Sequence, residues 1–277
     1  MRHTAAIGAR LRLATWNVNS LAVRLPQLLE WLAVQAETAP VDAIVLQETK
    51  LTDDKFPQAE LAAAGWQVQC FGQKTYNGVA LLSRTPAEAV SRNIPGFADE
   101  QARVIAGTLP CGPGAGGLRV IGAYVPNGQA PGSDKFDYKM RWLRALRDWL
   151  REELAAHPRL VLMGDFNIAP EDRDVHDPVA WQDQIHCTPE ERGRLRELLA
   201  LGLVDAFRLF EQPPRSWSWW DYRNLAFRKN QGLRIDLALV SAALQPEVRG
   251  CTIDKTPRRN ERPSDHAPVL LTLGTGG

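Results

Sequence analysis

The chain has 277 residues, of which 44% are hydrophobic and 23% are charged, and its formal net charge is +1 at pH 7. These values are typical of a globular protein long enough to bury a large core, in one large domain or two small ones. The near-neutral charge gives no support for nucleic-acid binding, although a local basic face is compatible with it. Apolar runs are all shorter than the roughly 18 residues that a membrane helix needs, so we expect no membrane span.

The N-terminus and the cysteines bear on processing and location. The first ten residues lack the apolar stretch of a secretion signal. We therefore expect residues 1–10 to form a flexible extension ahead of a single domain over residues 11–277. The four cysteines lie far apart in the sequence, which disfavours a CxxC zinc site or a disulfide framework. They indicate reduced thiols in a cytoplasmic protein.

The first half of the chain contains mostly short apolar segments. Alternating apolar residues from Leu11 predict a strand that ends at Asn17, and leucines at helical spacing predict a helix that begins at Pro26. The apolar run at 41–46 predicts a strand with Glu48 just beyond its end. Two further strands, joined by an Asn-Gly turn, are predicted over 66–71 and 79–83.

The second half repeats this pattern with longer helices. Strands are predicted over 103–109 and 118–125 with a Gly-rich hairpin loop between them, and over 160–163, 234–240 and 269–273. One helix is predicted over 137–154. A capping box at 188–191 predicts another, which ends near Gly202. Because helices do not follow each strand, the pattern favours two mixed or antiparallel sheets with helices outside over a parallel βαβ repeat.

The segment VLMGDFNIAP, residues 161–170, shows where chemistry is expected. An apolar strand ends at Gly164 and is followed at once by Asp165 and Asn167. A turn is the simplest interpretation, because Gly, Asp and Asn are common turn residues. However, polar side chains follow or begin several other apolar strands, namely Asn17, Asn19, Glu48, Tyr124, Asn127, Asp236, Asp265 and His266.

These strand ends would form one cluster if they met at one edge of the sheets. Several carboxylates at close range repel one another, and burying them is costly unless a cation compensates. A hard divalent cation with oxygen ligands, such as Mg²⁺, is the natural solution. Structural alternatives remain for individual members: a hydrogen bond within the Asp265-His266 pair, and an ion pair of Asp236 with Arg234 or with a distant arginine.

The order of these motifs resembles the exonuclease III family, the bacterial branch of the apurinic/apyrimidinic (AP) endonucleases in the endonuclease/exonuclease/phosphatase superfamily. The resemblance covers residues 11–273. It rests on seven segments: Trp16–Asn19, Leu46–Lys50, Gly78–Ser83, Tyr124–Gly128, Gly164–Asn167, Gly232–Asp236 and Ser264–Val269.

This resemblance implies a four-layer α/β sandwich, with two mixed β-sheets packed face to face and helices on both outer sides. It also implies Mg²⁺-dependent cleavage of DNA phosphodiesters, with Mn²⁺ able to substitute. The implied substrates are duplex DNA with abasic sites, cut on the 5′ side, and 3′ ends, from which nucleotides and blocking groups are removed. We expect a monomer without an obligate protein partner.

Attack of water on a phosphodiester needs a base, groups that hold the water and the phosphate, and charge neutralisation, and we assign the residues to these roles. Asp165 is the expected base, and Asn167 would hold the water or the phosphate. His266, oriented by Asp236, would contact the phosphate. Tyr124 and Asn127 are expected to bind phosphate oxygens. A metal site is expected with Glu48 as its first ligand; the residues expected near the ion are Asn17, Asn19, Asp165, Asn167, Asp265 and His266.

Substrate-binding residues are sought in the aromatic segment that begins at Ser216. Core packing is one interpretation of this segment; the other places Trp219, Leu233 and Phe227 around a flipped-out abasic sugar. Basic residues flank the motifs, and Arg223 and Arg258 are expected to contact DNA phosphates. Two other functions are weighed: a phosphodiesterase or phosphatase of the same fold on a non-DNA substrate, and an inactive DNA-binding homologue, which the intact Asp, Glu and His positions disfavour.

Overall fold

A computed structural model describes residues 10–111 and 116–274. Within these residues, twelve strands form two six-stranded sheets, with the orders β11-β12-β1-β2-β4-β3 and β5-β6-β7-β8-β10-β9. In the first sheet β1–β2 is the parallel pair, and in the second β7–β8 is the parallel pair; the other pairs are antiparallel. The strands are β1 Arg10–Asn17, β2 Ala43–Gln47, β3 Gln67–Phe71, β4 Val79–Ser83, β5 Glu88–Arg92, β6 Val104–Pro110, β7 Gly117–Tyr124, β8 Leu160–Asp165, β9 Leu203–Asp205, β10 Asp236–Ser241, β11 Val248–Ile253 and β12 Val269–Gly274.

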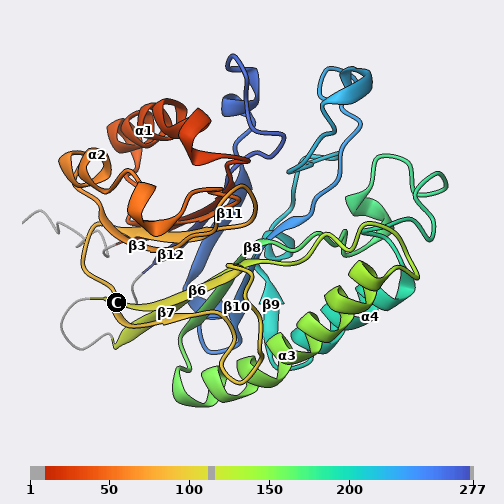
Figure 1. Ribbon diagram of the computed structural model, residues 1–277, viewed down its shortest axis with the longest axis horizontal. Coiled ribbons are helices and arrows are strands. Elements are labelled where there is room, and N and C mark those ends of the chain that lie inside the picture. The colour runs from red at the N-terminus through yellow and green to blue at the C-terminus, as the bar shows by residue number, and fades with distance from the viewer. Residues whose placement is uncertain (1–9, 112–115, 275–277) are drawn as a thin grey trace, which may run out of the picture.

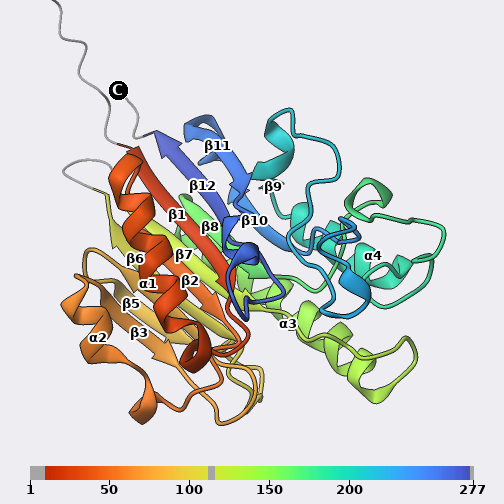
Figure 2. The same ribbon diagram turned by 90° about the horizontal axis from the view of Figure 1, so that it is seen from above.

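Helices cover the outer face of each sheet. The α-helices are α1 Leu21–Thr38, α2 Gln58–Ala63, α3 Asp134–Ala156 and α4 Pro189–Leu199. Figure 1 shows α1 and α2 on one side of the molecule and α3 and α4 on the other, with the sheets between them; Figure 2 shows the same layers from above. The predicted four-layer α/β sandwich is confirmed. None of the helices in the described part of the chain is long and apolar enough to cross a membrane.

Successive side chains of each strand point to opposite faces of its sheet, and this divides the core into three layers. Residues such as Leu13, Val45 and Met163 point between the sheets, and their neighbours point toward the helices. Trp16 and Trp31 pack between the first sheet and α1. The sheets approach so closely at Gly122 that a Cβ there would lie 2.9 Å from Val45 Cβ.

Element boundaries differ from the sequence prediction, and two of these differences have a clear physical reason. Helix α1 begins at Leu21 rather than Pro26, because the backbone N–H groups of Ser20 and Leu21 bond to the carbonyls of Glu48 and Thr49 and order the turn before the proline. β10 begins at Asp236 rather than Arg234, because the N–H groups of 235 and 236 bond to Ser218 Oγ instead of a strand.

Of the four strands at sheet edges, β3 was predicted and the other three were not. β5, β9 and β11 lie at or near sheet edges, where one face is solvated and the apolar pattern is weak. The expected extension at 1–10 lies outside the described residues except for Arg10, which begins β1. The predicted Gly-rich loop is likewise described only at its ends.

Candidate active site

Strand register brings the predicted polar residues to one edge of both sheets. Asp165 at the end of β8 lies opposite Tyr124 of β7 and Asp236 of β10. In the other sheet, β1 ends at Asn17, which lies opposite Gln47 at the end of β2, and Glu48 follows directly. His266 precedes β12, whose first residue pairs with Thr15 two residues before the end of β1.

Local backbone geometry explains the Gly164-Asp165-Phe166-Asn167 segment. Gly164 has φ +151°, and a Cβ at this position would lie 1.9 Å from the carbonyl oxygen of Ala123, so only glycine fits. Asp165 Oδ1 accepts a hydrogen bond from the Asn167 N–H at 2.9 Å, and Asn167 has φ +49°. The segment is therefore a turn, as its composition indicates, and this turn directs both side chains into the cluster.

Asn17 connects the two sheets at the centre of the cluster. Its Nδ2 donates to Glu48 Oε1 at 2.9 Å and to Asp165 Oδ2 at 2.9 Å, while its Oδ1 accepts from the Asn19 N–H. Asn17 is fully buried and Asp165 is 1% exposed. In this orientation Asn17 directs its amide nitrogen, not an oxygen, toward the carboxylates.

Asp236 orients His266. The imidazole Nδ1 donates to Asp236 Oδ2 at 2.9 Å, and Nε2 faces Asp165 Oδ2 at 3.7 Å. The two structural alternatives are therefore wrong: His266 pairs with Asp236 rather than Asp265, and the buried Arg234 pairs with Asp174 and Asp205 rather than Asp236.

Burial and neighbouring charge shift the pKa values of this pair. Loss of solvation and the nearby Asp236 raise the pKa of Asp165 well above its usual range. Burial opposes charge on His266, but the carboxylates of Asp236 and Asp165 outweigh it and raise the pKa of the imidazole. A carboxylate with a raised pKa is a better proton acceptor at neutral pH than an ordinary aspartate.

Burial also raises the pKa of Tyr124 well above its usual value, with the charges of Glu48 and Asp165 adding to the effect. The phenol therefore stays protonated and can donate a hydrogen bond. Asn167 Nδ2 lies 3.3 Å from Asp165 Oδ2, and Asn127 Nδ2 lies 3.4 Å from Asn167 Oδ1. The cluster thus presents donors suited to phosphate oxygens beside a candidate base.

The donor set fits a divalent cation. One ligand atom each from Glu48, Asp165 and His266 lie within 4.8 Å of one another. Two carboxylates are the oxygen ligands that hard cations prefer. The Lys50 ammonium lies 3.0 Å from Glu48 Oε2 and so supplies positive charge at the same place. Asp265 is not a member of this group of three, and its two oxygens accept hydrogen bonds from Asn19 Nδ2 and Trp219 Nε1, each at 3.0 Å.

The chain matches the model of the Endonuclease/Exonuclease/phosphatase family over residues 14–266, which include Asn17, Glu48, Asp165, Asp236 and His266. The chain belongs to this family. Its sequence is 35% identical to that of exodeoxyribonuclease III from Haemophilus influenzae, and the alignment covers 94% of this chain and 98% of that relative.

Solved structures agree with this assignment. The family member NExo from Neisseria, described as a 3′ phosphatase bound to product DNA hairpin, superposes with a TM-score of 0.89 at 45% identity, covering 95% of this chain and 99% of that one. An AP endonuclease from Archaeoglobus fulgidus has a TM-score of 0.87 at 33% identity, covering 95% and 99%. The protein is thus a DNA repair nuclease of the endonuclease/exonuclease/phosphatase family, whose members depend on divalent metal.

The predicted substrate-binding residues are not all brought together. Trp219 lines an open pocket of about 400 Å³ with Trp181 and Arg223, and packs on the fully buried Leu233. Phe227 lies instead against Trp220, with ring centroids 5.1 Å apart. Arg258, only 6% exposed, lies over the Phe227 ring, and its Nη1 donates to the Ser264 carbonyl oxygen.

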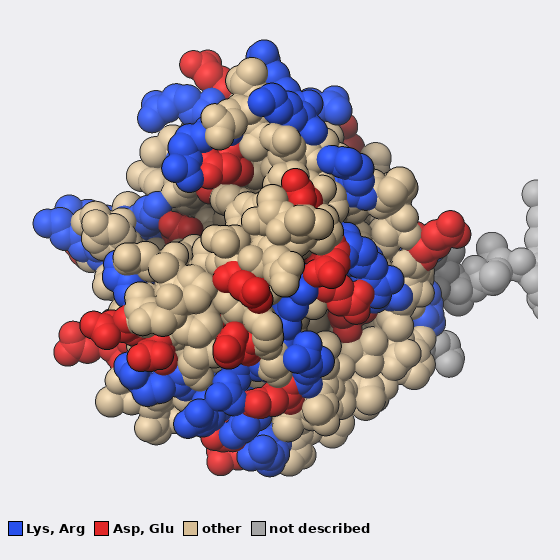
Figure 3. Space-filling model, turned by 90° about the vertical axis from the view of Figure 1, so that its right-hand side faces the viewer, with Lys and Arg blue, Asp and Glu red and all other residues tan. Residues whose placement is uncertain are grey.

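Exposed basic residues lie on two loops near the site. Arg223 is exposed at the surface, as are further cations of the loops, which are Arg228, Lys229, Arg259 and Arg262. In Figure 3, Lys and Arg side chains gather at the upper end of the molecule, where Figure 1 draws these loops. A local basic face thus exists on a chain of nearly neutral charge.

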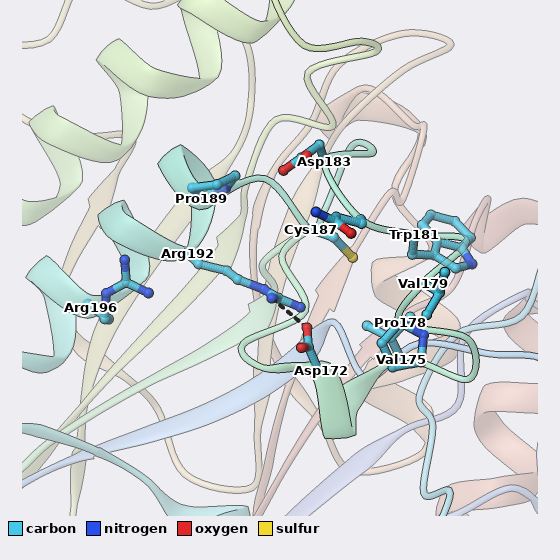
Figure 4. Close-up of a pocket in the computed structure, with 11 residues that line it drawn as sticks. Asp172, Val175, Pro178, Val179, Trp181, Asp183, Cys187, Pro189, Arg192 and Arg196 are labelled. Atoms are coloured by element: carbon cyan, nitrogen blue, oxygen red, sulfur yellow. Dashed lines mark hydrogen bonds and ion pairs between the residues drawn. The ribbon is translucent and has the colours of Figure 1, made fainter.

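A separate pocket of about 530 Å³ lies between α4 and the preceding loop and contains none of the catalytic cluster. Figure 4 shows Arg192 paired there with Asp172, at 2.8 Å, so the charge of this guanidinium is compensated within the protein.

Sequence reasoning missed the side chains that support the catalytic ones. Lys139, His186 and Glu191 are buried behind Asn127 and Asn167, and Ser218 Oγ accepts the backbone N–H of Asp236. The capping box at Thr188 and Glu191 was visible in the sequence, but its connection to Lys139 was not.

Proposed function

We propose that this protein is an Mg²⁺-dependent nuclease, with Mn²⁺ able to substitute, that cuts duplex DNA 5′ to abasic sites and removes nucleotides and blocking groups from 3′ ends. The observation that carries the proposal is the meeting of Glu48, Asp165 and His266 at one edge of the two sheets. Relatives described as an exodeoxyribonuclease III, a 3′ phosphatase and an AP endonuclease support both types of substrate.

In the proposed reaction Asp165 accepts the proton of the attacking water, and Asn167 orients that water beside it. His266, held by Asp236, and Tyr124 donate hydrogen bonds to phosphate oxygens, and Asn127 adds a donor at the outer end of the cluster. A divalent cation held by Glu48 would neutralise phosphate charge and assist the leaving oxygen. The raised pKa of Asp165 supports its role as base.

The substrate test uses three labelled duplexes: one with a tetrahydrofuran abasic analogue, one with a 3′-phosphate end and one intact. Each is incubated with Mg²⁺, with Mn²⁺ and with EDTA. The proposal expects metal-dependent incision at the analogue, release of the 3′ phosphate and shortening of the intact strand from its 3′ end. Failure to cut any of the three duplexes with either metal would refute DNA as the substrate. Cutting of only one kind of duplex would limit the activity to that kind of substrate.

A further inference from the structure

A buried lysine connects the two loops that carry Asn127 and Asn167. Lys139, on α3, is fully buried, and its Nζ donates to the carbonyl oxygens of Asn127 at 3.1 Å and Asn167 at 2.7 Å. Its third partner is the carboxylate of Glu191. An ammonium has three donors, so Lys139 is saturated by these contacts.

Glu191 holds the ammonium in a fixed place. Its Oε1 accepts from the His186 N–H at 3.1 Å, and its Oε2 accepts from the N–H and hydroxyl of Thr188 at 3.1 and 2.9 Å. Glu191 is thus part of the capping box that begins α4. His186 Nδ1 also lies 2.7 Å from the Asn167 carbonyl oxygen. The Asn167 backbone is therefore held from two directions.

The loop geometry requires such support. Asn167 has φ +49°, a left-handed conformation that asparagine adopts more readily than other non-glycine residues but that still costs some free energy. In the other loop Gly128 has φ +88°, and a Cβ there would lie 3.0 Å from Lys139 Cδ. The Asn127 loop thus lies directly on the aliphatic part of the lysine, while the Asn127 side chain remains exposed on the substrate side.

Stability alone is a weak explanation for this ion pair. Burying two charges costs several kcal/mol each, and apolar residues of similar volume are often as stabilising. What the ammonium supplies is a single donor group that bonds two carbonyls from different loops. Asn167 then presents its Nδ2 3.3 Å from the Asp165 carboxylate, and Asn127 Nδ2 lies 3.4 Å from Asn167 Oδ1.

We propose that Lys139 is a positioning residue for phosphodiester hydrolysis, which fixes Asn127 and Asn167 through their backbone carbonyls while Glu191 anchors it. The proposal rests on the proposed function, because it assigns these amides to the water and the phosphate. Lys139 touches neither, so its removal is expected to lower turnover without abolishing DNA binding.

The chain offers a matched control in another buried cation, whose acidic partner lies on the same helix as Lys139. Arg119 is 3% exposed and pairs with Glu153 of α3 at 2.6 Å, but it lies near the start of β7, at the opposite end of the sheet from Tyr124. Lys139→Met and Arg119→Met each remove one buried cation. Glu191→Gln and Glu153→Gln form a second pair that keeps side-chain shape and removes only charge.

Lys139→Met is expected to lower kcat at least about tenfold with KM changed less than about threefold, because small displacements of catalytic groups are costly. Arg119→Met, compared at equal folded fraction by circular dichroism, should keep kcat within about twofold. Equal kcat in the two variants would overturn the proposal. If Lys139→Met does not fold, Glu191→Gln against Glu153→Gln decides the question, with a smaller loss of kcat expected only for Glu191→Gln.

A double-mutant comparison separates positioning from general destabilisation. If Lys139 acts through Asn167, Lys139→Met should lower kcat much less in an Asn167→Ala background than in the wild type. The same fold-loss in both backgrounds would contradict the proposed route. Lack of activity in the wild type on all three duplexes would refute the proposed function instead, so the two failures are distinguishable.

Discussion

His186 should make the protein less stable as the pH falls from 7 to 5. Burial lowers its pKa to about 4, and the nearby Lys139 ammonium adds to this effect. An unfolded histidine has a pKa near 6.5, so between these values the unfolded chain binds a proton that the folded chain does not. Acidification through this window therefore favours unfolding.

The size of the effect follows from the difference between the two pKa values. Each pH unit below about 6.5 costs roughly 1.4 kcal/mol until the folded pKa is reached, so this residue alone should remove about 2 kcal/mol between pH 7 and pH 5. The total available down to pH 4 is about 3 kcal/mol. Other groups titrate in this range, so the test must compare variants.

Urea unfolding of the wild type, His186→Asn and His157→Asn at pH 7 and pH 5 isolates this contribution. An asparagine at 186 retains an N–H donor for the Asn167 carbonyl oxygen but does not titrate. His157→Asn is the control, because His157 lies at the C-terminal end of α3, away from the buried cluster. We expect His186→Asn to lose about 2 kcal/mol less than the wild type and the control on acidification. Equal losses in all three proteins would refute this explanation.

Three further predictions test the catalytic cluster and its support. Asp236→Asn removes the carboxylate that accepts a hydrogen bond from His266 Nδ1. Turnover in steady-state assays should fall at least about 100-fold, with the circular dichroism spectrum unchanged. Near wild-type turnover would contradict the role of this pair. Glu48→Gln should weaken Mn²⁺ binding, measured by electron paramagnetic resonance, by about tenfold or more, and unchanged affinity would remove Glu48 from the metal site. Arg234→Met removes the guanidinium that the buried Asp174 and the partly buried Asp205 share. Because Asp174 keeps its pair with Arg208, urea unfolding should show a loss near the lower end for a broken buried ion pair, about 3 kcal/mol; a loss below about 1 kcal/mol would show that the network is dispensable.

The strand pattern favoured two mixed or antiparallel sheets with helices outside, and the family resemblance implied their four-layer arrangement. The meeting of the polar residues could be expected because each lies at one end of a strand with a clear apolar pattern. Asn17 and Asp165 end buried strands and Glu48 directly follows one, and β7–β8 and β1–β2 are the central parallel pairs that bring such ends together. The order of the motifs along the chain then indicated the family.

What the sequence could not supply were contacts between residues far apart in the chain. In the sequence, Lys139 resembles any charged residue of an amphipathic helix, and Glu191 is predicted only as part of a helix cap. Their pairing depends on how α3 packs against α4. Arg258 reads as a phosphate contact because it lies in a basic run, yet its stacking on Phe227 buries it. A charge pattern alone does not distinguish an exposed cation from a buried one.

Single-turnover cleavage of the abasic-analogue duplex by the wild type and by Asp165→Ala tests the central claim most directly. Asp165 is buried at the meeting point of both sheets, where it faces Asn17 and His266. Its loss should lower the cleavage rate in Mg²⁺ by about 10²–10⁴-fold, with cooperative urea unfolding retained. EDTA should abolish cleavage by the wild type. Near wild-type cleavage by Asp165→Ala would contradict a reaction centred on this carboxylate.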